Sequence, residues 1–221
     1  HVRSRRQRQM CIRDSDDTIQ PDRGFGTHGH QDMEIVTYVI RGGLTHKDSM
    51  GNEETLKRGS IQFMTAGTGI MHSEYNKHLE HDLRLIQSWI LPREQGLTPR
   101  YGSFSADNKK LDRHLNQWFH LVSDMEGQGQ VQINQDFNLF VSEIETGNSI
   151  QYELSPERLA YVVCLEGGLK VNNIILENHE AAEIHPTSET FPLTFYGQKG
   201  EERTHLLFYE MANYQQAIFQ I

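Results

Sequence analysis

The sequence predicts an all-β protein built from two sandwich or barrel domains. Short runs rich in β-branched and aromatic residues alternate with glycine-containing turns, as in residues 34–40 (EIVTYVI) and 159–165 (LAYVVCL). Many short strands at turn-punctuated intervals are typical of sandwiches and barrels. The most polar stretch, residues 105–117, separates two such series and is the best candidate for a domain boundary.

We therefore expect one domain over residues 16–110 and a second over residues 111–221. The first fifteen residues hold five arginines, do not begin with methionine, and include QRQMCIRDS, which resembles translated sequencing-adaptor sequence. We treat residues 1–15 as a non-native leader outside the fold. Native-looking sequence then begins near Asp16, so the first domain is expected to be truncated at its N-terminus.

The strands of the first domain follow from their residues. Residues 34–40 have high β propensity and stop at Gly42. The return strand, residues 44–48, leads into a hairpin loop with Gly51 at a position that needs a positive φ. Further strands are expected at residues 60–65 and 83–91.

The second domain echoes the first, because Gly167 and Gly168 lie between a strand and a return strand just as Gly42 and Gly43 do. A short helix is expected in the tail, residues 211–221. The strands of this domain are expected at residues 118–122, 131–134, 138–144, 159–171, 194–196 and 205–210.

Composition limits the classes of partner. The formal net charge is −9, and without residues 1–15 it becomes −13, because 16 basic and 29 acidic residues then remain. An acidic body argues against nucleic acid as a direct ligand. No apolar run approaches the roughly 18 residues of a membrane span, so no membrane partner is expected. Cys11 and Cys164 have no plausible framework role, which favours a reducing cytoplasm.

Two pairs of potential metal ligands are the main functional signal: His28 with His30, and His72 with Glu74. Residues two apart on a strand point to the same face, so two neighbouring strands would bring three imidazoles and one carboxylate together. One H-x-H alone is weak evidence, since histidines are common on half-buried strands. The second pair follows a glycine-rich turn, and together the four favour a metal site. Four ligands on an octahedral ion leave two positions open for chemistry, and a closed zinc site would more often contain cysteine.

These residues lie in segments that resemble a known family. THGHQDMEIVTYV (27–39), HKDSMGN (46–52) and MTAGTGIMHSEY (64–75) are similar to the pirin family of the cupin superfamily, whose bacterial members include quercetin 2,3-dioxygenases. The resemblance is dense over residues 24–92 and looser beyond. It implies a bicupin fold of two jelly-roll barrels.

The resemblance places the metal ligands on His28, His30, His72 and Glu74. In other cupins the glutamate of the first motif is often a ligand, and Glu34 holds that place here. We expect Glu34 to have a structural role or to support a ligand from behind. His46, on the return strand, is expected to be exposed or at the rim of the pocket.

The second domain is expected to hold no metal. Upstream of Tyr161, where H-x-H would lie, the chain reads SPERLA. Glu157, His179 and His185 are scattered, and we do not expect them to form a site. His114 and His120 are lone histidines to which we assign no role.

The resemblance implies a metal-dependent dioxygenase that opens the ring of flavonols such as quercetin with O₂. Fe(II) is the first choice of metal, with Cu, Ni, Mn, Co or Zn as alternatives, and Glu74 is the candidate base for the flavonol hydroxyl. The alternative is a redox-sensing interaction protein or transcriptional cofactor with a protein partner. Isomerisation or decarboxylation of a small acid ranks last. Four residues could line an apolar substrate pocket, although ordinary core packing is favoured for them: Tyr38, Ile40, Met64 and Trp89.

Overall fold

The computed structural model describes residues 12–106, 113–186, 189–198 and 202–212. These residues form strands and turns and contain no α-helix, which confirms the all-β prediction. The described part of the chain therefore holds no helix with the length and apolar character that a membrane span requires.

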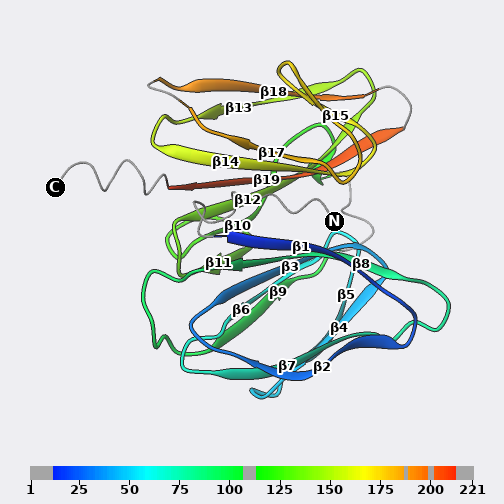
Figure 1. Cartoon of the computed structure of the whole chain (residues 1–221), viewed down its shortest axis with the longest axis vertical. Coiled ribbons are helices and arrows are strands. Elements are labelled where there is room, and N and C mark those ends of the chain that lie inside the picture. Colours follow the sequence, from blue (N-terminus) through cyan, green and yellow to red (C-terminus); the bar gives the residue numbers. More distant parts are fainter. Residues whose placement is uncertain (1–11, 107–112, 187–188, 199–201, 213–221) are drawn as a thin grey trace. The chain divides into compact units, whose positions relative to one another are not determined.

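The chain divides into two compact units (Figure 1). The first comprises residues 1–108 together with 130–135, and the second comprises residues 109–129 and 136–221. Domains were expected at 16–110 and 111–221. The difference is the short segment 130–135, which belongs to the first unit although it lies beyond the polar stretch.

The first unit contains two antiparallel sheets. One has the strand order β1-β8-β3-β6-β9 and the other has the order β2-β7-β4-β5. The strands of this unit are β1 (Ile12–Ile19), β2 (Arg23–His30), β3 (Glu34–Arg41), β4 (Gly43–Asp48), β5 (Glu53–Lys57), β6 (Ile61–Thr65), β7 (Ile70–Asn76), β8 (Leu83–Ile90), β9 (Arg100–Phe104) and β11 (Val131–Ile133).

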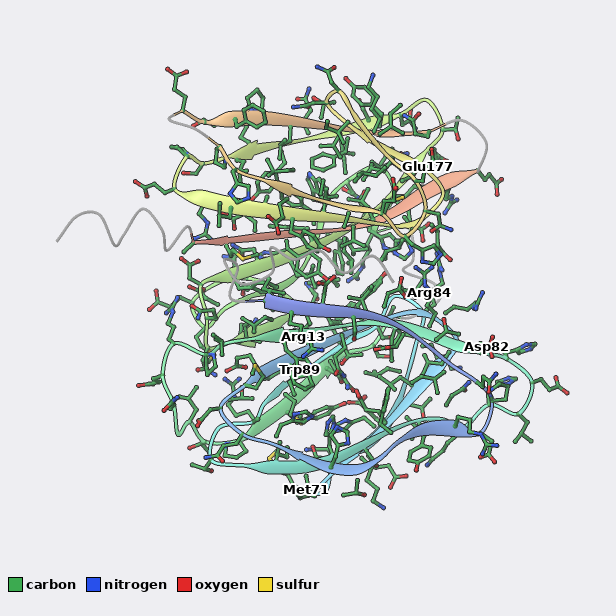
Figure 2. The ribbon with its side chains drawn as sticks, in the orientation of Figure 1. Arg13, Met71, Asp82, Arg84, Trp89 and Glu177 are labelled. Carbon is green, nitrogen blue, oxygen red and sulfur yellow. The ribbon has the colours of Figure 1, made fainter. Side chains whose placement is uncertain are left out.

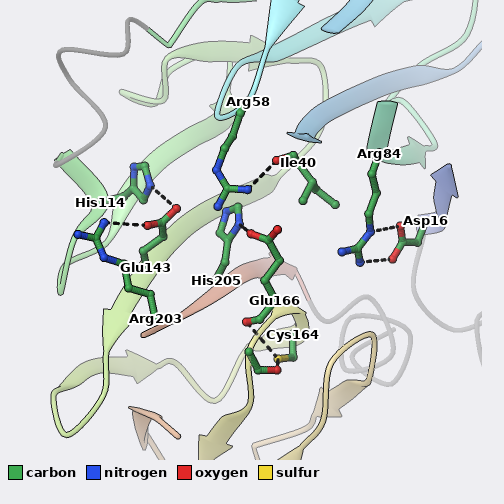
Figure 3. Close-up of polar contacts among 11 residues, drawn as sticks. Asp16, Ile40, Arg58, Arg84, His114, Glu143, Cys164, Glu166, Arg203 and His205 are labelled. Carbon is green, nitrogen blue, oxygen red and sulfur yellow. Dashed lines mark hydrogen bonds and ion pairs between the residues drawn. The ribbon is translucent and has the colours of Figure 1, made fainter. Parts of the chain in front are cut away.

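Strand β1 corrects the expected start of the fold. It pairs with β8 along its whole length, from Ile12 opposite Ile90 to Ile19 opposite Leu83. The Arg84 guanidinium on β8 donates to both carboxylate oxygens of Asp16, at 2.9 and 2.6 Å (Figure 3). Placing residues 12–15 outside the fold was therefore wrong, because an edge strand of polar sequence is held by backbone pairing and this ion pair. Residues 1–11 lie outside the described residues.

The core of the first unit fills the space between its sheets. Val39, Leu44 and Leu83 are completely buried and belong to one apolar cluster. Tyr38 and Ile40 are also buried, as expected for core residues. Strand β3 is buried along almost its whole length because β8 and β6 flank it, which explains its nearly continuous apolar sequence.

The second unit repeats this two-sheet plan. One sheet contains β10, β12, β19, β14 and β17 in that order, and the other has the order β13-β18-β15-β16. Met211 and Ala212 lie in β19, so the helix expected from residue 211 does not begin there, and residues 213–221 lie outside the described residues. The strands of this unit are β10 (Phe119–Asp124), β12 (Phe137–Glu145), β13 (Ser149–Leu154), β14 (Arg158–Glu166), β15 (Leu169–Val171), β16 (Ile174–Leu176), β17 (Ala181–Ile184), β18 (Phe191–Gly197) and β19 (Arg203–Ala212).

Polar pairs inside the second unit have structural partners. The Glu143 carboxylate lies between His114 Nε2 at 3.5 Å and an Arg203 guanidinium nitrogen at 3.3 Å (Figure 3). His205 Nδ1 lies 3.0 Å from a carboxylate oxygen of Glu166. The buried Cys164 thiol lies within the apolar core, and its Sγ donates to the Gly167 carbonyl oxygen at 3.4 Å.

Candidate metal centre

Strands β2 and β7 place the two ligand pairs side by side. In the β2–β7 ladder His28 lies directly opposite His72 and Phe25 lies opposite Glu74, with a bulge between Phe25 and His28. The ring centroids of His28 and His72 are 4.4 Å apart, and each lies 4.9 Å from the centroid of His30. The H-x-H and H-x-E spacing therefore brings the three imidazoles together as expected.

Two glycines allow close backbone approaches around the centre. A Cβ on Gly24 would lie 2.3 Å from the backbone oxygen of Glu74, so a side chain there would push β2 away from β7. Gly67 has a φ of +46°, and a Cβ on it would lie 1.9 Å from the backbone oxygen of Leu97. Gly24 therefore lets β2 lie against β7, whereas Gly67 lets the turn before β7 pass close to the loop at Leu97.

The nitrogens of the three histidines fit a cation. One ligand nitrogen from each of His28, His30 and His72 lies within 4.8 Å of the other two. His28 Nδ1 lies 2.8 Å from the Gly26 carbonyl oxygen, which can only accept, so Nδ1 carries the proton and Nε2 keeps its lone pair. His30 Nε2 and both ring nitrogens of His72 are buried without a hydrogen-bond partner. Such nitrogens are costly to bury, and a bound metal would satisfy one nitrogen of each ring.

Burial keeps these imidazoles in the form that binds metal. It lowers the pKa of His72 to about 3, with smaller contributions from His28, His30 and His46. Burial and the neighbouring His28 also lower the pKa of His30. Neutral imidazole is the ligand form, so both side chains are ready to bind a cation at neutral pH.

Glu74 is held by two carboxamides. Gln62 Nε2 donates to Oε1 and Gln87 Nε2 donates to Oε2, both at 2.8 Å. Burial raises the pKa of Glu74, and the hydrogen bond from Gln87, the electrostatic influence of the nearby His28 ring and the hydrogen bond from Gln62 partly oppose it. A carboxylate oxygen of Glu74 lies within 4.8 Å of ligand nitrogens of His72 and His46. The donors therefore form two groups that share His72.

A cavity of about 270 Å³ opens onto this centre. The Trp89 ring lies 4.9 Å from the His30 ring, and Trp89 Nε1 donates to Gln87 Oε1 at 2.8 Å. Figure 2 shows Arg13 of β1 beside Trp89 of β8, and the guanidinium carbon lies 6.0 Å from the ring centroid. The residues that line the cavity are Arg13, Asp14, Ser15, Asp17, Phe25, His28, Glu74, Gln87 and Trp89.

Several of these lining residues were not expected. Arg13, Asp14 and Ser15 were assigned to the leader, because they end the stretch QRQMCIRDS that resembles translated sequencing-adaptor sequence. Trp89 was a candidate wall for which core packing was favoured, and it does both: it packs against the apolar cluster around Met64 and also lines the cavity. No short motif marks Gln87, which is found only through its contacts.

Glu34 and His46 lie in different surroundings. Glu34 on β3 is buried and accepts hydrogen bonds from Thr65 Oγ1 at 2.8 Å and Asn134 Nδ2 at 2.9 Å, which agrees with a structural role. His46 is fully buried rather than exposed or at the rim, so that expectation was wrong. It lies on β4, opposite Glu74 of β7, so β7 separates it from β2. The sequence alone does not reveal this pairing.

Within the described residues, groups of histidine, cysteine and acidic side chains suited to a metal occur in the first unit alone. Glu157, His179 and His185 form no such group. His120 Nε2 pairs with Asn138 Oδ1 at 2.9 Å.

Comparison with known proteins agrees with this architecture. Residues 3–90 match the family Pirin, and residues 120–211 match the Quercetinase C-terminal cupin domain. A protein of Escherichia coli strain K12 named quercetin 2,3-dioxygenase is 35% identical over 189 residues, which cover 82% of this chain and 79% of that protein. The chain belongs to the pirin family. The bicupin fold implied by the resemblance is thereby confirmed.

Solved pirin structures superimpose on both units. The crystal structure of YhhW from Escherichia coli has a TM-score of 0.82 at 30% identity and covers 93% of this chain and 83% of its own. A second structure, of bacterial pirin YhhW in complex with nickel(II), has a TM-score of 0.79 at 30% identity, with 90% and 81% covered. That pirin, which is 30% identical to this chain, was thus solved with a divalent metal bound.

Proposed function

We propose that this pirin is a metal-dependent dioxygenase that opens the ring of flavonols such as quercetin, with O₂ as the second substrate. The observation that carries the proposal is the set of buried imidazole nitrogens without partners, on His30 and His72, beside a cavity walled by Trp89 and Phe25. Such a place suits a flat aromatic molecule with adjacent oxygens that reach a metal ion. The relatives named quercetin 2,3-dioxygenase support the same substrate class.

The proposed metal ligands are His28, His30, His72 and Glu74. Fe(II) is the first choice, and Cu, Ni, Mn, Co or Zn could occupy the same donors. A bound divalent ion would lower the pKa of a hydroxyl that binds to it and would offer open positions to the substrates. Affinity of such donors rises toward Cu, so the purified metal need not be the physiological one.

Glu74 is proposed to take the proton of the flavonol hydroxyl. Its pKa is raised chiefly by burial, which makes it a better base than an exposed carboxylate. The amides of Gln62 and Gln87 hold its two oxygens in place. The proton would go to the oxygen that faces the cavity, beside His28.

Gln87 and Trp89 are proposed to orient this base. The indole N–H of Trp89 can only donate, so the Gln87 amide must turn its oxygen toward Trp89. The amide nitrogen of Gln87 then faces Glu74 and donates to it. The same indole forms part of the cavity wall, so one residue would contact an aromatic substrate and fix the geometry of the base.

The test is turnover by the chain loaded separately with Fe(II), Ni(II) and Cu(II). Loss of the visible absorption of quercetin with one O₂ consumed per flavonol would support the dioxygenase, and Glu74→Gln should lower kcat at least about a hundredfold. A chain that binds metal and consumes no O₂ with any of the three ions would overturn the proposal. The redox-sensing alternative would then be preferred.

A further inference from the structure

His46 is a buried histidine that the four-ligand site does not use. Its ring stacks on Tyr101, with centroids 4.3 Å apart and planes 8° from parallel. The Tyr101 hydroxyl donates to Glu54 Oε1 at 2.7 Å, which holds the phenol ring in place. His46 therefore has little freedom to turn away from the centre.

Asp48 determines which nitrogen of His46 carries the proton. Asp48 Oδ2 lies 3.2 Å from His46 Nε2, and Oδ1 accepts backbone N–H groups of Met50 and Asn52 at 2.9 and 3.0 Å. Burial would raise the pKa of Asp48, but the hydrogen bonds from Asn52 and His46 outweigh it and lower the pKa. The carboxylate can only accept, so His46 Nε2 donates and Nδ1 keeps a lone pair.

That lone pair has no protein partner, although His46 lies beside the centre. His46 Nδ1 is buried and makes no hydrogen bond. Ligand atoms of His46, His72 and Glu74 all lie within 4.8 Å of one another. A carboxylate that fixes a histidine tautomer behind a bare nitrogen is the arrangement that commonly supports a metal-binding histidine.

We propose that His46, His72 and Glu74 form a second donor set for a divalent cation, with His46 binding through Nδ1. The set shares His72 with the imidazole trio. Bonds of about 2.0–2.2 Å allow two donors of one ion to lie at most about 4.4 Å apart. Each set is compact enough to hold an ion after small side-chain shifts. In the intact chain the ion would occupy the position at the cavity wall with His28, and the fully buried position with His46 would hold an ion when His28 and His30 are replaced.

This inference rests on the proposed metal site and adds a ligand to it. It is tested by Cu(II) binding to the full chain, with calorimetry for affinity and pulsed electron paramagnetic resonance for coordinated imidazoles. The variants are His28→Ala/His30→Ala, the same pair with His46→Gln, and the same pair with Asp48→Asn. His185→Gln, a half-exposed histidine of the second unit, is the control.

Asp48→Asn is the sharper variant because it keeps the volume of the side chain. Backbone N–H groups at Oδ1 would hold the asparagine oxygen, so its NH₂ would face His46 Nε2 and the Asn52 carboxamide, which can turn its oxygen toward it. His46 must then accept at Nε2 and carry its proton on Nδ1, which removes the lone pair without removing the ring. This variant therefore separates loss of the donor from loss of packing, and circular dichroism checks that each variant is folded.

The proposal expects the His28→Ala/His30→Ala chain to bind one Cu(II) with imidazole signals. Adding His46→Gln or Asp48→Asn should weaken that binding at least tenfold, whereas His185→Gln should not change it. No binding by the double variant, or binding that neither addition alters, would overturn the second donor set. These binding measurements do not involve flavonol, so the second donor set can be tested even if the chain shows no turnover. A wild-type chain that binds no Cu(II) would overturn the proposed function as well.

Discussion

His28 lies directly across the β2–β7 ladder from His72, with ring centroids 4.4 Å apart. The pairing joins two motifs separated by more than forty residues, and it makes the metal centre a property of sheet register. A shift of one residue in this register would turn one of the two ligands away from the other.

Replacing a proposed ligand should therefore lower the bound metal far more than replacing Glu34, a nearby buried acid that is not a proposed ligand. We expect His28→Ala and Glu74→Ala each to lower metal affinity at least about tenfold, because each removes a donor that no neighbouring side chain can replace in the cavity-side position. Glu34→Ala should keep most of the metal, since Glu34 bonds to Thr65 and Asn134. Metal analysis after dialysis measures this, and metal retained in Glu74→Ala but lost in Glu34→Ala would reverse the assignment.

Trp89→Phe should slow the reaction while leaving the metal in place. The ring that lines the cavity is kept, but the indole donor that orients Gln87 is lost, so the amide can turn and present its oxygen to Glu74. We expect kcat to fall about tenfold with metal content unchanged and KM changed less than threefold. An unchanged kcat would show that Gln87 needs no such orientation.

Gly67→Ala should destabilise the first unit. The new Cβ would meet the Leu97 backbone oxygen, and the residue would have to keep a positive φ, which together cost about 2 kcal/mol or more. Gly51→Ala is the matched control: Gly51 also has a positive φ but has nothing within 4 Å of the added Cβ, so about 1 kcal/mol is expected. Urea denaturation gives both values, and equal losses would argue against a close approach at Gly67.

Acid should weaken the second unit through His120. Burial lowers the pKa of His120 below 6.5, so below that pH the unfolded chain binds a proton there that the folded chain does not. The free energy of unfolding then falls as the pH falls from 6.5 toward the lowered pKa, by at most about 1.4 kcal/mol per pH unit. His120→Gln should remove this part of the slope between pH 7 and 5, and His185→Gln should retain it. A slope identical in wild type and His120→Gln would contradict the assignment.

The strands that flank the ligand strands, such as residues 34–40 and 83–91, could be predicted from their high β propensity. The ligand strands themselves were inferred from the spacing of the ligands, because β2 reads RGFGTHGH and has no such propensity. H-x-H and H-x-E placed the ligand pairs on common strand faces, and the pirin resemblance connected them. Strand β1 could not be predicted, since IRDSDDTI has no apolar alternation and is held by pairing with β8 and by Asp16 with Arg84.

The residues that surround the ligands also could not be predicted from sequence patterns. Gln62 and Gln87 come from different strands, and only the fold shows that both donate to Glu74. The position of His46 was misjudged for a related reason: strand alternation gives the face of a side chain but not the neighbour across the ladder, which here is Glu74.

The most direct test of the account is anomalous X-ray diffraction from crystals of the metal-loaded chain at the absorption edge of the bound ion. We predict one peak within about 2.0–2.3 Å of a nitrogen from each of His28, His30 and His72 and of a Glu74 oxygen. A peak away from these side chains, or bonded to fewer than two of the three imidazoles, would contradict the account.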